Sequence, residues 1–136
     1  MLHALDHIGF AVPNLEEALA ALKNILGKGE VHFEEVDDQG VRVACIPLRD
    51  CNLELLEPTR ADSPIAKFLE KKGPGVHHLA FAVDDVEEKL RVLSEGGVRL
   101  VDEKPRLGAE GKRIAFLHPK STGGLLIELC DRKGES

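Results

Sequence analysis

The 136-residue sequence contains no tryptophan, no tyrosine and only one methionine, and 4% of its residues are aromatic. Such a chain offers few flat side chains on which unpaired bases could stack, so single-stranded nucleic acid is not an expected ligand. Basic residues are not in excess either: 18 lysines and arginines stand against 24 acidic residues, for a formal net charge of −6. An acidic chain without a basic stripe is not expected to bind a phosphate backbone.

Long apolar runs and paired cysteines are also absent. No 18-residue apolar stretch is present, so no membrane span is expected, and the first residues lack the charged and apolar regions of a signal peptide. The three cysteines, Cys45, Cys51 and Cys130, are odd in number and show no CxxC spacing. Reduced cysteines are typical of the cytoplasm, and we expect a cytoplasmic protein that does not bind membranes.

What the sequence does contain is a repeat. The segment DHIGFAVPNL at 6–15 reappears as HHLAFAVDDV at 77–86. Each copy is followed by a helical pattern and ends in an apolar run that carries one carboxylate, Glu54 in the first copy and Glu128 in the second. A duplicated unit that brings one histidine and one glutamate per copy can assemble two imidazoles and two carboxylates around a divalent metal.

The repeat also predicts the fold. Periodicity and turn residues predict, in each copy, a strand, a capped helix and three further strands. The expected strands are 3–12, 31–37, 41–48 and 51–57 in the first copy, and 76–83, 98–101, 112–118 and 124–130 in the second. The expected helices begin after Asn14, after Asp62 or Ser63, and after Asp84 or Asp85. The result is an α+β fold of paired β-α-β-β-β modules in one domain, with module one at 1–58, a linker helix at 59–75 and module two at 76–136.

Strand alternation groups the histidines with small residues. His7 shares a strand face with Leu5, Gly9 and Ala11, and His78 shares its face with two alanines, whereas most bulky side chains point the other way. A face of small residues leaves volume for a ligand or a metal. His77 points to the opposite face by the same alternation, so we exclude it as a ligand.

The two glutamates strengthen the metal hypothesis. Glu54 and Glu128 lie in runs of leucine and isoleucine, where an unpaired carboxylate would be costly. Four protein ligands on an octahedral ion leave two positions open for a bidentate oxygen substrate. Nitrogen and oxygen donors of this kind suit cobalt, manganese, nickel, zinc or iron. A lone histidine or glutamate in a strand is more often structural, but equivalent placement in two copies favours the metal site.

These motifs resemble the vicinal-oxygen-chelate (glyoxalase-like) superfamily and, within it, the methylmalonyl-CoA epimerases. The segments that carry the resemblance are 6–12, 55–58, 62–69, 75–79, 116–120 and 124–129. The resemblance implies a divalent metal, cobalt first and manganese, nickel or zinc as alternatives, held by four residues: His7, Glu54, His78 and Glu128. Many epimerases carry glutamine in place of Glu54. The family also implies a homodimer.

The implied activity interconverts the (2R) and (2S) forms of methylmalonyl-CoA by proton abstraction at C2 through a metal-stabilised enolate. Glu128 is the first candidate for the acid/base group. The second is open among Glu54, Glu35 and a water, because this chain has Val43 where some epimerases have a glutamate. The loop around 104–113 carries cations expected to meet the substrate carboxylate or the CoA phosphates, unless it is only a solvated loop. These cations, together with one beyond the loop, are Arg106, Lys112, Arg113 and Lys120.

Three other functions are compatible with such a fold. The first is a glyoxalase I-like lactoylglutathione lyase, whose ligand types the acidic Glu54 matches, although the linker and the His118-Pro119-Lys120 segment argue against it. The second is an extradiol dioxygenase, whose iron typically takes two histidines and only one carboxylate. The third is a non-catalytic drug-binding module, which commonly lacks the metal ligands.

Overall fold

The computed structural model describes residues 4–27 and 29–131, which form two compact units. The first unit consists of residues 8–77, and the second unit combines residues 4–7 with 78–131. The boundary between them runs through two strands, so the N-terminal end of the first strand belongs to the second unit. The expected modules 1–58 and 76–136, with their linker helix at 59–75, stay a prediction.

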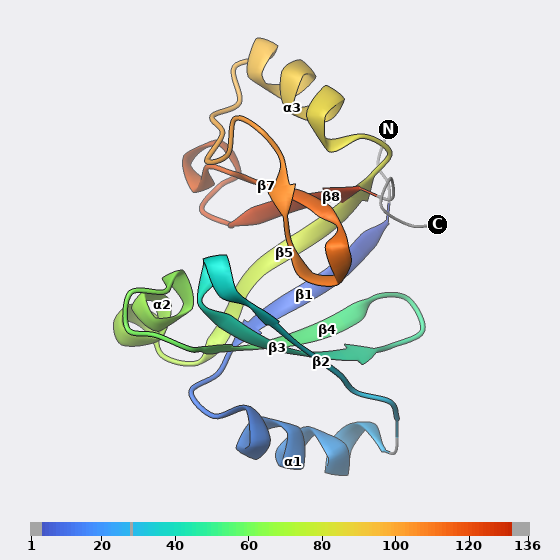
Figure 1. Cartoon of the computed structure of the whole chain (residues 1–136). Coiled ribbons are helices and arrows are strands. Elements are labelled where there is room, and N and C mark those ends of the chain that lie inside the picture. The colour runs from blue at the N-terminus through green and yellow to red at the C-terminus, as the bar shows by residue number, and fades with distance from the viewer. Residues whose placement is uncertain (1–3, 28, 132–136) are drawn as a thin grey trace. The chain divides into compact units, whose positions relative to one another are not determined.

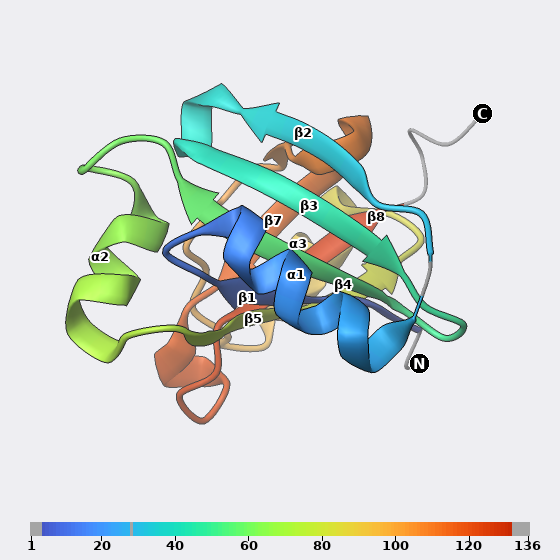
Figure 2. The same ribbon diagram turned by 90° about the horizontal axis from the view of Figure 1, so that it is seen from below.

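The first unit contains an antiparallel sheet of β2, β3 and β4, and a helix covers one face of it (Figure 2). Strand β3 pairs with β2 on one side and with β4 on the other, and Val12 N donates to Leu56 O at 2.9 Å where the chain leaves β1. Its elements are β1 (Leu5–Ala11), α1 (Leu15–Leu26), β2 (His32–Val36), β3 (Val41–Pro47), β4 (Asn52–Pro58) and α2 (Pro64–Lys72). Residue 3 of the expected first strand lies outside the described residues.

Local sequence signals account for these helices. Asn14 caps α1 by accepting a hydrogen bond from Glu17 N at 2.9 Å, as predicted. Ser63, rather than Asp62, caps α2 by accepting from Ala66 N at 3.1 Å, and a proline follows at the first helical position. The apolar stripe of α1, which includes the buried Leu15, packs on one face of β3 and β4. This packing leaves the other face of the same strands for other contacts.

The second unit repeats the plan with parallel pairing at its centre (Figure 1). Its central strand, β8, pairs with β5 in parallel and with β7 in antiparallel fashion. Strand β6 then pairs with the other edge of β7. Asp85 caps its helix, whose Val86 and Leu90 pack on apolar residues of the sheet. The elements are β5 (Gly75–Val83), α3 (Val86–Glu95), β6 (Arg106–Leu107), β7 (Arg113–Leu117) and β8 (Ile127–Asp131).

One expected strand is wrong. The segment 98–101 makes only a single bridge, between Leu100 and Leu117. Val101 N and Asp102 N both donate to Phe116 O, and the Asp102 carboxylate accepts from Phe116 N at 2.8 Å. A side chain therefore takes the place of the next ladder bond, and the two-residue β6 pairs with β7 instead. No helix among the described residues is long and apolar enough to cross a membrane.

Candidate metal centre

One face of the second unit's sheet carries a histidine and a glutamate among small residues. Ala80 and Ala82 lie on this face with Phe116 and the buried Cys130, and the register pairs Glu128 with Ala80 on one side and with Phe116 on the other. His78 precedes Ala80 by two residues and therefore shares its face. Burial raises the pKa of the Cys130 thiol, which keeps this neighbour of the carboxylate neutral.

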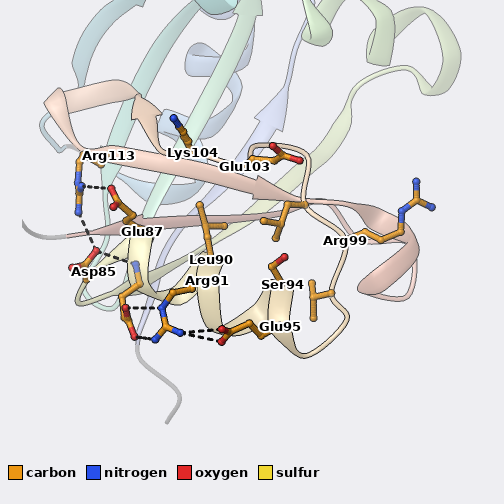
Figure 3. A pocket seen from close by; sticks show the side chains of 13 residues that line it. Asp85, Glu87, Leu90, Arg91, Ser94, Glu95, Arg99, Glu103, Lys104 and Arg113 are labelled. Carbon is orange, nitrogen blue, oxygen red and sulfur yellow. Dashed lines mark hydrogen bonds and ion pairs between the residues drawn. The ribbon is translucent and has the colours of Figure 1, made fainter.

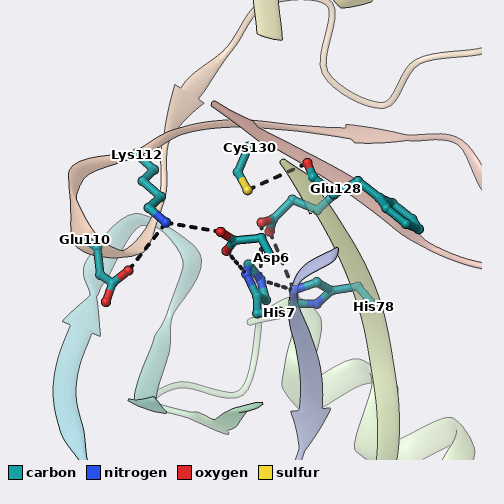
Figure 4. Close-up of polar contacts among 8 residues, drawn as sticks. Asp6, His7, His78, Glu110, Lys112, Glu128 and Cys130 are labelled. Atoms are coloured by element: carbon teal, nitrogen blue, oxygen red, sulfur yellow. Dashed lines mark hydrogen bonds and ion pairs between the residues drawn. The ribbon is translucent and has the colours of Figure 1, made fainter. Parts of the chain in front are cut away.

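Three potential metal ligands converge on this face (Figure 4). The Nε2 atoms of His7 and His78 are 3.0 Å apart, and the Glu128 carboxylate lies 3.3 Å from the first and 3.6 Å from the second. All three residues are at most 6% exposed. The first strand β1, the mid-chain strand β5 and the last described strand β8 thus bring together two imidazoles and one carboxylate.

These separations fit a divalent ion. Metal–ligand bonds of about 2.0–2.1 Å place neighbouring donor atoms roughly 3.0 Å apart at right angles and roughly 3.4 Å apart in a tetrahedron. Two of the observed separations, 3.0 and 3.3 Å, lie within that range, and the third, 3.6 Å, is slightly longer. The donors also have the mixed imidazole and carboxylate character that first-row divalent metals accept. The residues present therefore fit a metal.

Asp6 joins this cluster through the far side of the His7 ring. His7 Nδ1 donates to Asp6 Oδ2 at 2.8 Å, and Lys112 Nζ donates to Asp6 Oδ1 at 3.2 Å. The hydrogen bond from His7 and the charge of Lys112 outweigh the cost of burial and lower the pKa of Asp6 to about 2. Sequence reasoning missed Asp6, because strict alternation points it away from its neighbour His7.

Phe116 forms an aromatic wall beside the cluster. Its ring meets the ring of His78 edge-on, with centroids 5.6 Å apart. The Arg106 guanidinium stacks over the same Phe116 ring at 5.5 Å, on the strand position that pairs with Ile114. Among the predicted substrate-binding cations, Arg106 therefore contacts the histidine face through the ring of Phe116. The sequence indicates that Phe116 lies in a buried strand, but no sequence pattern predicts its contacts with His78 and Arg106.

The other three predicted cations have different surroundings. Lys112 is largely buried and pairs with Asp6 and, at 3.8 Å, with Glu110. Lys120 is exposed in the short turn after β7. Arg113 pairs with Asp131 at 2.6 Å and with Asp85 at 3.2 Å, which ties β7 to the end of β8 and to the cap of α3.

Arg113 also lines a groove of about 940 Å³ along α3 (Figure 3). Charged side chains of both signs line the groove, and several are paired with each other, as Arg91 is with Glu88 and, at 3.0 Å, with Glu95. Alternation along β7 places Arg113 with Ala115, on the face that packs on α3 and not on the histidine face. The described residues that line this groove do not include His7, His78 or Glu128.

Glu54 lies in the first unit. It is 6% exposed and pairs across the sheet with Cys45, on the face opposite the helix α1. Val43 lies on this same face, and the register places Glu34 directly across from it. Glu35, one of the sequence-derived candidates for the second acid/base, is instead paired with Arg42 on the face that carries α1.

His77, the histidine excluded on alternation, has an environment of its own. Its ring meets Phe68 of α2 edge-on at 5.1 Å. Burial, together with the charge of Lys72, lowers the pKa of His77 to about 4, so the ring is neutral at physiological pH. Its neighbour His78 belongs to the group of three residues that could hold a metal ion.

Comparisons with known proteins show the family to which this chain belongs. A profile of the Glyoxalase/Bleomycin resistance protein/Dioxygenase superfamily matches residues 6–116. The human mitochondrial methylmalonyl-CoA epimerase is 42% identical over 129 residues, which cover 94% of this chain and 73% of the human protein. The chain belongs to the methylmalonyl-CoA epimerase family.

Two further matches cover nearly the whole chain. The uncharacterized protein YqjC of Bacillus subtilis is 47% identical over 98% of this chain and 96% of its own length. A solved structure of a methylmalonyl-CoA epimerase in complex with methylmalonyl-CoA and NH4+ has a TM-score of 0.92 at 41% identity, and covers 100% of this chain and 99% of that one. The predicted α+β fold class of glyoxalase-like β-α-β-β-β modules is therefore confirmed, and the chain is a member of an enzyme family.

Proposed function

We propose that this protein is a metal-dependent epimerase that interconverts (2R)- and (2S)-methylmalonyl-CoA. The observation that carries the proposal is the buried convergence of His7, His78 and Glu128 within a member of the epimerase family. A site of two neutral imidazoles and a carboxylate attracts a divalent cation, and the cation's open positions can accept two substrate oxygens. The substrate class follows from the relatives named for methylmalonyl-CoA.

We assign Glu54 as the fourth ligand. It is a buried carboxylate on the face of its sheet that does not pack on α1, and the repeat makes it the counterpart of Glu128. Two carboxylates would balance the charge of a divalent ion, for which cobalt is our first choice and manganese, nickel or zinc the alternatives. When bound, the ion would stabilise the enolate charge that develops as the C2 proton leaves.

The protein's own carboxylates move the proton in this proposal. Glu128 takes or returns the C2 proton on one side of the substrate. One of its two carboxylate oxygens would bind the metal while the other reaches the substrate. Glu54 serves the other side. The chain has Val43 at the position where some epimerases carry a glutamate, and Glu35 faces the wrong side of the sheet for this task.

Cations would hold the anionic parts of the substrate. Arg106, stacked on Phe116 beside His78, is the best-placed partner for the substrate carboxylate. Lys112 and the exposed Lys120 remain candidates for the carboxylate or the CoA phosphates. Arg113 was predicted for the same role, but its pairing with Asp131 favours a structural one.

Deuterium exchange tests the proposal. The metal-loaded protein is incubated with methylmalonyl-CoA in deuterated water, and C2 is followed by proton NMR. We expect metal-dependent loss of the C2 proton signal with interconversion of the epimers. Glu128→Gln should abolish the exchange, whereas the exposed control Glu87→Gln should not change it. Absence of exchange with every divalent metal tried would reject the proposal.

The glyoxalase I-like alternative has one observation in its favour, the acidic Glu54 in place of the glutamine common among epimerases. The same protein is therefore offered the hemithioacetal of methylglyoxal and glutathione. Lactoylglutathione formation without exchange of methylmalonyl-CoA would favour the lyase. The homodimer and the cytoplasmic location stay predictions, tested by light scattering of the purified protein and by cell fractionation.

A further inference from the structure

The second unit contains an uninterrupted polar chain that ends at the metal-ligand cluster (Figure 4). Lys112 Nζ lies 3.2 Å from Asp6 Oδ1, and Asp6 Oδ2 lies 2.8 Å from His7 Nδ1. The opposite nitrogen of the same ring, His7 Nε2, lies 3.0 Å from His78 Nε2 and 3.3 Å from Glu128. The Asp6 carboxylate therefore lies between the ammonium group of Lys112 and the ring of His7, a candidate metal ligand.

This arrangement determines which ring nitrogen of His7 can bind a metal. A neutral imidazole has one N–H and one lone pair, and a carboxylate can only accept a hydrogen bond. Asp6 therefore requires the proton on Nδ1, which leaves the lone pair on Nε2, the nitrogen that faces Glu128. Lys112 occupies the other oxygen of Asp6 and so limits its rotation away from the ring.

We propose that Asp6 is a positioning residue that fixes the tautomer and orientation of His7 for metal binding. The inference rests on the proposed metal site but concerns a residue outside the proposed ligand set. Carboxylates that accept from a ligating histidine hold the ring and raise its basicity, and their loss typically weakens metal affinity about 10- to 100-fold. His78 supplies the other imidazole, and its ring is held by a different contact, the edge of Phe116.

Asp6→Asn is the informative substitution because its shape is conserved while its hydrogen-bonding is not. The amide can present its NH2 group to Nδ1 and so stabilise the wrong tautomer, which a carboxylate cannot do. Two-bond 1H–15N correlation NMR of the metal-free protein reports the tautomer directly. His7 signals are assigned by their loss in His7→Gln. Calorimetry then measures Co2+ affinity independently of any turnover.

We expect His7 of the unsubstituted protein to carry its proton on Nδ1. In Asp6→Asn, the Nε2-protonated form should appear and Co2+ affinity should fall about 10- to 100-fold. Asp6→Glu should recover much of both readouts, since it restores an acceptor-only group. The control Asp84→Asn removes an exposed carboxylate from the same unit, and it should match the unsubstituted protein in both readouts.

The outcomes separate this inference from the proposed function. An unchanged tautomer and unchanged Co2+ affinity in Asp6→Asn would overturn the role of Asp6 while leaving the metal site intact. Failure of the unsubstituted protein to bind any divalent ion would overturn the proposed function, and the tautomer measurement would still decide whether Asp6 orients His7. Circular dichroism of each variant verifies folding, and Asp6→Glu supplies the comparison if Asp6→Asn does not fold.

Discussion

The adjacent residues His77 and His78 lie in different environments and have different predicted roles. His78 belongs to the buried ligand cluster, whereas His77 packs on Phe68 and is kept neutral by burial. Strand alternation alone predicted this difference. Alternation failed, however, for Asp6, whose side chain reaches the ring of the next residue at the start of β1. Side-chain torsions near a strand end are not fixed by the backbone pattern.

The neutral state of His77 predicts a pH dependence of stability. The pKa of this ring falls from 6.5 to about 4 on folding, so between those values the unfolded chain binds more protons. Stability should therefore be lost as pH falls from about 6.5 towards 4, by up to about 3 kcal/mol from this residue. Urea unfolding of the metal-free protein at pH 7.5 and pH 5 measures the loss.

Two variants isolate the contribution of His77. His77→Gln has no ring to titrate, so it should lose less stability between pH 7.5 and pH 5 than the unsubstituted protein. His32→Gln, whose histidine is exposed on β2, should show the same pH dependence as the unsubstituted protein. If His77→Gln is as pH-sensitive as His32→Gln, His77 is not the source.

The elements of the second unit are joined by an ion-pair network centred on Arg113. Asp131 is 1% exposed, accepts from Val86 N at 3.1 Å and pairs with the Arg113 guanidinium. Asp85, which caps α3, pairs with the same guanidinium. The network thus connects β7, the end of β8 and the first turn of α3, and its loss would leave a buried carboxylate without its cation.

Arg113→Met should therefore destabilise the protein strongly and lower its unfolding temperature by several degrees. Arg91→Met removes an arginine of the exposed face of α3, whose surface pairs contribute little, and should leave the unfolding temperature nearly unchanged. Thermal unfolding followed by circular dichroism compares the two. Equal effects would show that the Arg113 network is not structural. An unchanged unfolding temperature with a raised KM for the CoA thioester would instead favour the substrate-binding role.

Across the whole molecule, the sequence predicted what local rules govern. The cap at Asn14, a cap at one of the two aspartates 84 and 85, and the repeat of the β-α-β-β-β plan were readable because capping residues and periodicity act over a few positions. The segment 98–101 was not, because the side chain of Asp102 decides where its ladder ends. Pairing of Arg113 and the contact of Arg106 with Phe116 depend on register between strands distant in the sequence, which no local pattern specifies.

Glu54, the proposed fourth ligand, lies in the first unit. An ion that binds only the folded chain stabilises it by mass action, by about 2.7 kcal/mol at 100 times its dissociation constant and by about 1.4 kcal/mol if binding is tenfold weaker. Urea unfolding with and without Co2+ measures this gain. We expect Glu54→Gln, which keeps an amide oxygen, to retain most of it.

Glu54→Leu has no donor atom and should gain less than about 1.4 kcal/mol at the same Co2+ concentration. The exposed control Glu30→Gln should gain as much as the unsubstituted protein. If Glu54→Leu also gains as much, Glu54 is not a ligand. The set would then reduce to His7, His78 and Glu128, and two histidines with one carboxylate are the ligand types typical of non-haem iron sites. The result for Glu54 therefore bears directly on which metal, and which branch of the superfamily's chemistry, this chain supports.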